Sequence, residues 1–321
     1  MKQKHFWLIL LTVSALFPAC QNIDKLSETG ALVPPTVEED PDLPSVFLNN
    51  TLFHAETFGN PDDPVIIVLH GGPGADYRSM LPYKELAQEG FYVVFWDQRG
   101  AGLSQRQDKD QITLDNYLED LKQVIDHYTR SDTRQVILFG HSWGAMYATM
   151  YVNAFPQRVS KVVLCEPAAF TSDDLRDFFK KAYQPAFFEE TTNDLAWSDG
   201  LISADEHAVQ DYKRALVIES VSDHEQNNPA RPAPHWRWGA VASIWLPQSQ
   251  KDFDWTTRLG EFQGKALFID GEWGSVHTLE RQKMLAAHYP DATVVTVNNA
   301  GHDVLYQQFE TCKNLIVNFL K

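Results

Sequence analysis

The chain has 321 residues, of which 44% are hydrophobic and 22% charged, a composition typical of a folded globular protein. This length suits one large α/β domain, or one domain that carries a sizeable insertion. Because the formal net charge is -16, the chain repels phosphate backbones, and nucleic acid is excluded as an expected partner.

Residues 1–20 have the pattern of an export signal. Lys2 and Lys4 precede an apolar run that ends at Ala19 and is followed by Cys20. The run is too short to cross a bilayer core of about 30 Å as a helix, and its basic start and small-residue end predict a signal peptide. The ending resembles a bacterial lipoprotein signal, which implies export, a lipid anchor on Cys20 and a place in the cell envelope. A plain secretory signal, with a periplasmic or secreted product, is the alternative.

Residues 21–45 combine four prolines with the acidic run 38–40, which predicts a flexible linker. From residue 46 to 167 the chain alternates short apolar runs with segments of helical spacing. The expected strands cover residues 65–69, 92–96, 136–139 and 162–165, and the expected helices cover residues 83–88, 114–128 and 145–155. This alternation predicts an α/β fold with a mostly parallel sheet and helices on both faces.

Residues 168–250 break the alternation and are rich in Trp, Asp and Pro. We interpret them as a helical cap over the carboxyl edge of the sheet, where open α/β sheets bind ligands. The core pattern resumes over residues 251–321. There the expected strands cover residues 266–269 and 293–297, and the expected helices cover residues 279–288 and 303–320.

The segment Gly140-His141-Ser142-Trp143-Gly144 is a G-x-S-x-G motif between an expected strand and an expected helix. In that setting the tight turn accepts only small residues around the serine, and its strain exposes the hydroxyl. Ser142 is therefore the predicted nucleophile.

A second loop, His70-Gly71-Gly72-Pro73-Gly74, also follows an expected strand. Consecutive glycines leave backbone N–H groups free to face a substrate, so the N–H groups of Gly72 and Trp143 are the predicted oxyanion donors.

These two segments, with Asp97-Gln98-Arg99-Gly100-Ala101-Gly102-Leu103-Ser104 between them, resemble the proline iminopeptidase branch of the α/β hydrolases. The resemblance covers roughly residues 50–165 and 265–320. It implies the α/β-hydrolase fold and a serine hydrolase that needs no cofactor. We interpret Asp97 and Arg99 as structural residues that brace the loop beside the elbow.

A serine nucleophile needs a histidine base and a carboxylate that orients it. His302 follows the last expected strand in a Gly-His pair, which is where the family carries its catalytic histidine. The family acid is missing, because Gly274 stands at its position. Glu166, just past the strand that follows the nucleophile helix, is the preferred acid, and Asp270 and Glu272 are the alternatives.

The cap departs from the family as well. Family members bind a free N-terminal amine with a glutamate after a second tryptophan, but Gly239 follows Trp238 here. Trp236, Trp238 and Trp245 are candidates to line an apolar substrate pocket, or they belong to the core of the cap.

The sequence thus predicts a hydrolase that cleaves an ester or amide of a small molecule or short peptide through an acyl-enzyme. Removal of N-terminal residues from peptides is one form of this activity. The alternative is a non-catalytic surface binding module on a hydrolase scaffold, which the gap at Gly274 would favour.

No Cys/His cluster has the spacing of metal ligands, so no metal is expected. Cys165 and Cys312 are predicted to be buried free thiols rather than a disulfide.

Overall fold

A computed structural model describes residues 33–131, 133–182, 207–222, 233–249, 252–274 and 276–321. The predicted export signal and the first part of the predicted linker lie outside these ranges, as do residues 183–206 and 223–232 of the predicted cap. Within the described residues, no helix has both the length and the apolar character needed to span a membrane.

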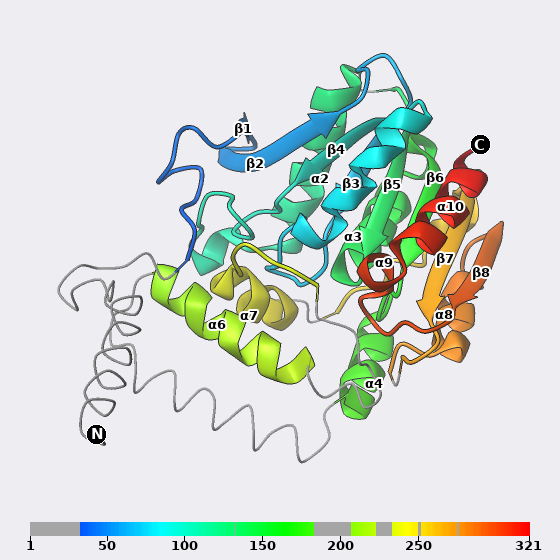
Figure 1. Cartoon of the computed structure of the whole chain (residues 1–321). Coiled ribbons are helices and arrows are strands. Elements are labelled where there is room, and N and C mark those ends of the chain that lie inside the picture. Colours follow the sequence, from blue (N-terminus) through cyan, green and yellow to red (C-terminus); the bar gives the residue numbers. More distant parts are fainter. Residues whose placement is uncertain (1–32, 132, 183–206, 223–232, 250–251, 275) are drawn as a thin grey trace, which may run out of the picture. The chain divides into compact units, whose positions relative to one another are not determined.

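An eight-stranded sheet organises residues 33–321 (Figure 1). Its strands are β1 Ser45–Leu48, β2 Thr51–Phe58, β3 Val65–Leu69, β4 Tyr92–Trp96, β5 Val136–His141, β6 Val159–Cys165, β7 Lys265–Gly271 and β8 Ala292–Val297. They lie in the order β1-β2-β4-β3-β5-β6-β7-β8. The pairs β1–β2 and β2–β4 are antiparallel and all other pairs are parallel, as the alternating sequence pattern predicts.

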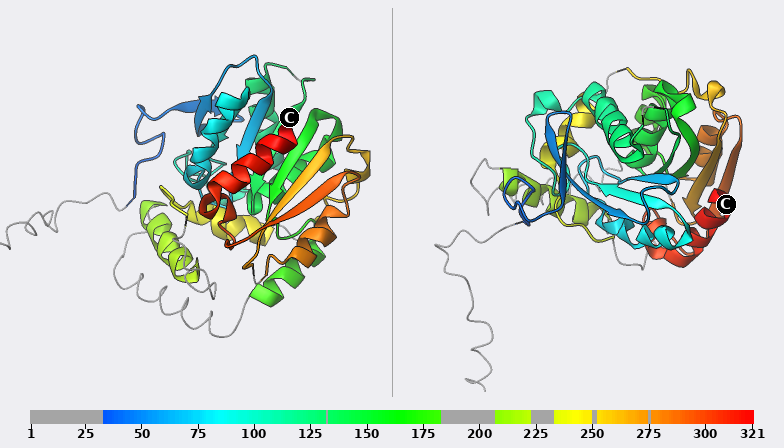
Figure 2. Two further views of the ribbon diagram at one scale, coloured as in Figure 1. Left: turned by 45° about the vertical axis from the view of Figure 1, so that its right-hand side comes forward. Right: turned by 90° about the horizontal axis from the view of Figure 1, so that it is seen from above.

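Helices cover both faces of this sheet, because β3 to β7 are apolar at every second position on each side (Figure 2). Ile67 of β3 packs in one cluster with α2 (Leu114–Thr129), α3 (Trp143–Ala154) and α8 (Leu279–Ala286). Its neighbour Ile66 packs on the other face with η2 (Arg78–Glu89), α9 (Val304–Gln307) and α10 (Phe309–Leu320). The carboxyl ends of the parallel strands therefore meet at one edge between two helical layers.

Some elements differ from the sequence expectation. Strands β1 and β2 were not predicted individually, because they form a partly exposed antiparallel edge without a long apolar run. The segment predicted as a helix over residues 83–88 is the longer 3₁₀ helix η2, which contains Pro82. Proline removes an N–H and clashes with the preceding turn, and both effects disfavour a regular α-helix. The predicted last helix is divided in two at Gln308.

Between β6 and β7 the described elements are α4 Ser172–Ala182, α6 His207–Ser222, α7 Ala240–Ser249 and the short 3₁₀ helix η5 Leu259–Glu261. Two further 3₁₀ helices of the same length lie earlier in the chain, η3 Lys109–Gln111 and η4 Pro156–Arg158. Cys165 and Cys312 are buried free thiols, which confirms the prediction for both.

Candidate active site

Ser142 lies in a strained turn between β5 and α3. Its backbone has φ +52° and ψ −118°, a region that L-residues seldom adopt. A Cβ on Gly144 would overlap the carbonyl oxygen of Leu69, and one on Gly140 would overlap that of Gly144. The Ser142 N–H donates to the carbonyl oxygen of Cys165 at 2.8 Å, which ties the turn to the end of β6. The two glycines are therefore a steric requirement of this elbow.

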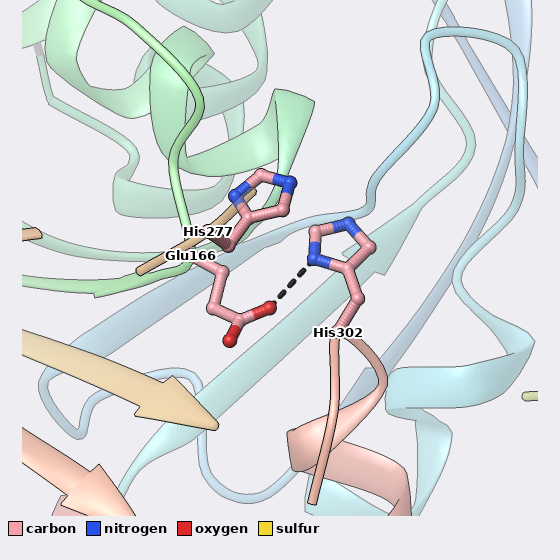
Figure 3. A group of neighbouring side chains, drawn as sticks. All are labelled: Glu166, His277 and His302. Carbon is pink, nitrogen blue, oxygen red and sulfur yellow. Dashed lines mark hydrogen bonds and ion pairs between the residues drawn. The ribbon is translucent and has the colours of Figure 1, made fainter. Parts of the chain in front are cut away.

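Glu166 and His302 form the central contact of the site (Figure 3). The Nδ1 atom of His302 lies 2.6 Å from Oε2 of Glu166, whose side chain is fully buried. The other oxygen, Oε1, accepts the N–H of Gly271 at 2.7 Å. A carboxylate held in this way keeps the proton on Nδ1 and leaves Nε2 to act as a base.

His141 links the elbow to His302. Its Nε2 donates to the His302 carbonyl oxygen at 2.7 Å, and the two ring centroids are 4.8 Å apart. Burial, together with the neighbouring His302, lowers the pKa of His141 to about 4. The described residues show no hydrogen bond between the Ser142 hydroxyl and the His302 ring. Hydrogen bonds between catalytic groups are often long or poorly aligned before substrate binds.

The loop after β3 lies against Ser142. A Cβ on Gly71 would be 3.3 Å from Cβ of Ser142, so the backbone approaches the serine as closely as a glycine allows. Gly72 has φ +124°, which a residue with a side chain would seldom adopt. Among the described residues, the N–H groups of Gly72 and Trp143 donate no backbone hydrogen bond. Both are therefore available to a ligand oxygen.

Gln98 joins three segments of the site. Its N–H donates to Nε2 of His70 at 3.0 Å, and its side-chain amide donates to the His70 carbonyl oxygen at 2.9 Å. Its Oε1 accepts the indole N–H of Trp143 at 2.9 Å. The loop after β3 and the elbow at Ser142 are thus fixed relative to each other by one buried side chain.

The two residues that flank Gln98, Asp97 and Arg99, tie its loop to neighbouring segments by hydrogen bonds and an ion pair. Asp97 accepts the N–H groups of Tyr77 at 3.1 Å and Leu103 at 2.8 Å. Arg99 forms a two-pronged, buried ion pair with Asp120, with distances of 2.7 and 2.6 Å. These contacts suit the structural role predicted for both residues.

The two alternative acids have other partners. Asp270 accepts the Thr296 hydroxyl at 3.2 Å, and burial, reinforced by the charge of Glu166, raises its pKa to about 7. Glu272 is exposed and accepts the N–H of Asn299 at 3.0 Å. Of the three candidates, the structure brings only Glu166 onto His302.

The position of the missing family acid is sterically closed. A Cβ on Gly274 would overlap the carbonyl oxygen of His277. The same loop places the His277 ring parallel to that of His302, with a centroid distance of 4.1 Å and an interplanar angle of 17°. Sequence reasoning missed His277, since nothing in its local sequence indicates this contact.

Glu166, His277 and His302 each offer one atom that could bind a metal, and these atoms lie within 4.8 Å of one another. Two histidines and a carboxylate are a common zinc set. However, an ion bound to an imidazole nitrogen lies in the plane of that ring, and stacked rings have separate planes. One ring would have to turn before both could bind one ion.

The three tryptophans occupy different settings. Trp236 packs edge-on against Tyr77, with centroids 5.1 Å apart. Trp238 is 9% exposed and contacts His235. Trp245 is 37% exposed and lies beneath the ammonium group of Lys109. Their predicted contact with a substrate stays a prediction.

Comparison with known proteins places this geometry in context. The family model described as alpha/beta hydrolase fold matches residues 64–309. A proline iminopeptidase from Heyndrickxia coagulans is 28% identical over 274 residues, which cover 79% of this chain and 90% of that protein. A proline iminopeptidase from Thermoplasma volcanium is 20% identical over 275 residues, with coverages of 80% and 88%.

Two solved structures share the fold. The proline iminopeptidase-related protein from Thermus thermophilus has a TM-score of 0.60 at 20% identity and covers 87% of this chain and 96% of its own. The enol-lactonase from Burkholderia xenovorans has a TM-score of 0.59 at 20% identity, with coverages of 86% and 99%.

Proposed function

Because the chain belongs to the α/β-hydrolase fold family, in its proline iminopeptidase-like branch, and is a hydrolase, we propose that it cleaves esters or amides through an acyl-enzyme on Ser142. The observation that carries this proposal is the 2.6 Å contact between Glu166 and Nδ1 of His302. It supplies the buried carboxylate that a serine–histidine pair requires.

In the proposed reaction, Nε2 of His302 accepts the Ser142 hydroxyl proton as Oγ bonds to the substrate carbonyl carbon. The carbonyl oxygen becomes negative and is stabilised by the N–H groups of Gly72 and Trp143. Glu166 stabilises the imidazolium. The proton then passes to the leaving alcohol or amine, and water, activated by the same histidine, releases the acid and restores the serine.

The proposal is preferred over a non-catalytic binding module, because that alternative depended on the absence of an acid at Gly274, and Glu166, directly after β6, contacts His302 instead.

We propose as substrate a small ester or amide, or a short peptide, without a requirement for a free N-terminal amine. The cap residue Gly239 supports this. Its N–H donates to the Gly74 carbonyl oxygen at 2.7 Å, and a Cβ at this position would overlap the carbonyl oxygen of Gly100. An amine-binding glutamate therefore has no room here, and an ammonium that is desolvated without a charge partner is costly. Removal of N-terminal residues remains a second candidate, supported by the names of the relatives.

A paired substrate set tests this proposal. Prolyl and other aminoacyl arylamides are compared with their N-acetylated forms and with acyl aryl esters, and Ser142→Ala is the control. We expect ester hydrolysis, and rates for free and acetylated amides that agree within about threefold, since Gly239 offers a free amine no charge partner that would distinguish it from the acetylated form. A preference of about 100-fold for free N-terminal proline would contradict the substrate proposal. Absence of turnover on every substrate would contradict the enzyme proposal itself.

We further propose that the protein is exported and anchored to the bacterial cell envelope by a lipid on Cys20, on the pattern of residues 1–20. Labelling of the wild type with a radioactive fatty acid, and loss of the label in Cys20→Ala, are the expected results. Equal labelling of both proteins would refute the anchor.

A further inference from the structure

Three contacts with described residues bear on the position of His302. Glu166 contacts Nδ1, His141 donates to its carbonyl oxygen, and His277 covers one face of its ring. The first two contacts fix one ring atom and the backbone. A ring held at one nitrogen can still rock about that hydrogen bond, and rocking moves Nε2, the atom that must reach Ser142. The rings packed against the His302 ring therefore help to set its plane, and His277 stacks on it more closely and more nearly parallel than His141 does.

His277 is suited to set this plane. The residue is 8% exposed, and its ring lies nearly parallel to that of His302 (Figure 3). Phe178 of α4 packs against it at a centroid distance of 4.8 Å. Arg281 lies over Phe178, and its guanidinium donates to the Ala168 carbonyl oxygen at 3.0 Å. The stacking ring is thus itself supported from behind.

The charge state of His277 also suits this role. Burial, and the neighbouring His302, hold its pKa well below the usual value, so it is neutral near pH 7. A neutral aromatic face beside His302 does not repel the imidazolium that forms when Ser142 loses its proton.

We propose that His277 is a positioning residue for the reaction, which keeps Nε2 of His302 directed toward Ser142 by stacking on its ring. This inference rests on the proposed serine hydrolase function. It also explains the loop that lacks the family acid. Glu166, directly after β6, supplies the carboxylate that the family places at position 274. The loop that contains Gly274 instead places the ring of His277 on the face of the His302 ring.

Three variants test the stack: His277→Phe, which keeps a flat aromatic ring, His277→Leu, which keeps apolar volume only, and His277→Ala. We expect His277→Phe to retain the wild-type kcat and rate of fluorophosphonate labelling within about threefold. We expect kcat and the labelling rate of the Leu and Ala variants to fall by about 10- to 100-fold, because small displacements of a catalytic group have effects of this size. Their KM should change by less than about twofold. Thermal unfolding checks that each variant is folded.

A proton NMR spectrum gives a readout that a purely structural role would not change. The proton shared by His302 and Glu166 should appear far downfield in the wild type and in His277→Phe, and Glu166→Gln assigns it by its loss. It should broaden or vanish in the Leu variant. A folded His277→Leu that labels at the wild-type rate and keeps the signal would overturn the proposal, as would a His277→Phe as slow as Ala. Failure of the wild type to label would instead refute the underlying function.

Discussion

The substitution Glu166→Gln replaces a side chain with two acceptor oxygens by one with a single oxygen and an NH₂ group. Among the described residues, the wild-type carboxylate accepts from the N–H of Gly271 at 2.7 Å and from Nδ1 of His302 at 2.6 Å. Glutamine can satisfy only one of them as an acceptor. The backbone N–H cannot change, whereas an imidazole can move its proton to the other nitrogen. We therefore expect the amide NH₂ to face His302.

In that orientation Nδ1 must accept, so the proton of His302 shifts to Nε2, which can no longer take the Ser142 proton. Loss of the correct tautomer costs about 10⁴-fold in rate, equivalent to about 5.4 kcal/mol of activation free energy. In the opposite orientation the amide NH₂ would face the N–H of Gly271, and these two buried donors without an acceptor would lower the stability by about 1–3 kcal/mol. Glu166→Gln should therefore be folded but nearly inactive.

The assay is kcat/KM on an acyl aryl ester, with the second-order rate of fluorophosphonate labelling as a substrate-independent check. Glu272→Gln is the matched control, since Glu272 is exposed and contacts only the Asn299 N–H among the hydrogen bonds described for its side chain. It should retain activity within about twofold. A Glu166→Gln protein within tenfold of wild type would refute the assignment of the acid, most directly if Asp270→Asn were inactive.

Three further predictions concern stability. The pKa of Asp270 rises from 3.8 to about 7 on folding, so its ionisation destabilises the folded protein as pH increases through this window. Asp270→Asn should therefore increase the free energy of unfolding at pH 8 by at most about 4 kcal/mol, measured as a higher Tm, and leave the Tm nearly unchanged at pH 4. Equal changes in Tm at both pH values would refute this reasoning. Gly144→Ala should lose about 3 kcal/mol or more in urea unfolding, because its Cβ overlaps the Leu69 carbonyl oxygen, and a loss below about 1 kcal/mol would contradict the steric argument. Arg99→Lys should lose about 2 kcal/mol, since lysine cannot pair with both oxygens of Asp120; unchanged urea unfolding would show that the pair contributes little.

The fold was predictable where burial leaves a clear pattern. Residues 65–69 and 136–139 are continuous apolar runs, because parallel strands are covered on both faces. The antiparallel strands at residues 45–58 were not named, because polar residues such as Asn49 and Asn50 interrupt the apolar pattern. Periodicity reports burial, and it weakens at the edge of a sheet.

The residues of the site likewise divide into those that the sequence could predict and those that it could not. Ser142 and Glu166 could be named from the sequence because each follows an apolar strand, and strand ends meet at one edge of a parallel sheet. The contribution of His277 could not be predicted, because a ring stack depends on the path of the loop after β7. The steric role of Gly239 depends likewise on the approach of Gly100, which is distant in sequence.

The central claim is that Ser142 is a nucleophile activated by His302. Mass spectrometry of the protein after reaction with a fluorophosphonate tests it most directly. We predict a single adduct that maps to Ser142, no adduct in Ser142→Ala, and labelling slowed by about 10³-fold or more in His302→Ala. An adduct on another residue, or a His302→Ala protein that labels at the wild-type rate, would contradict it.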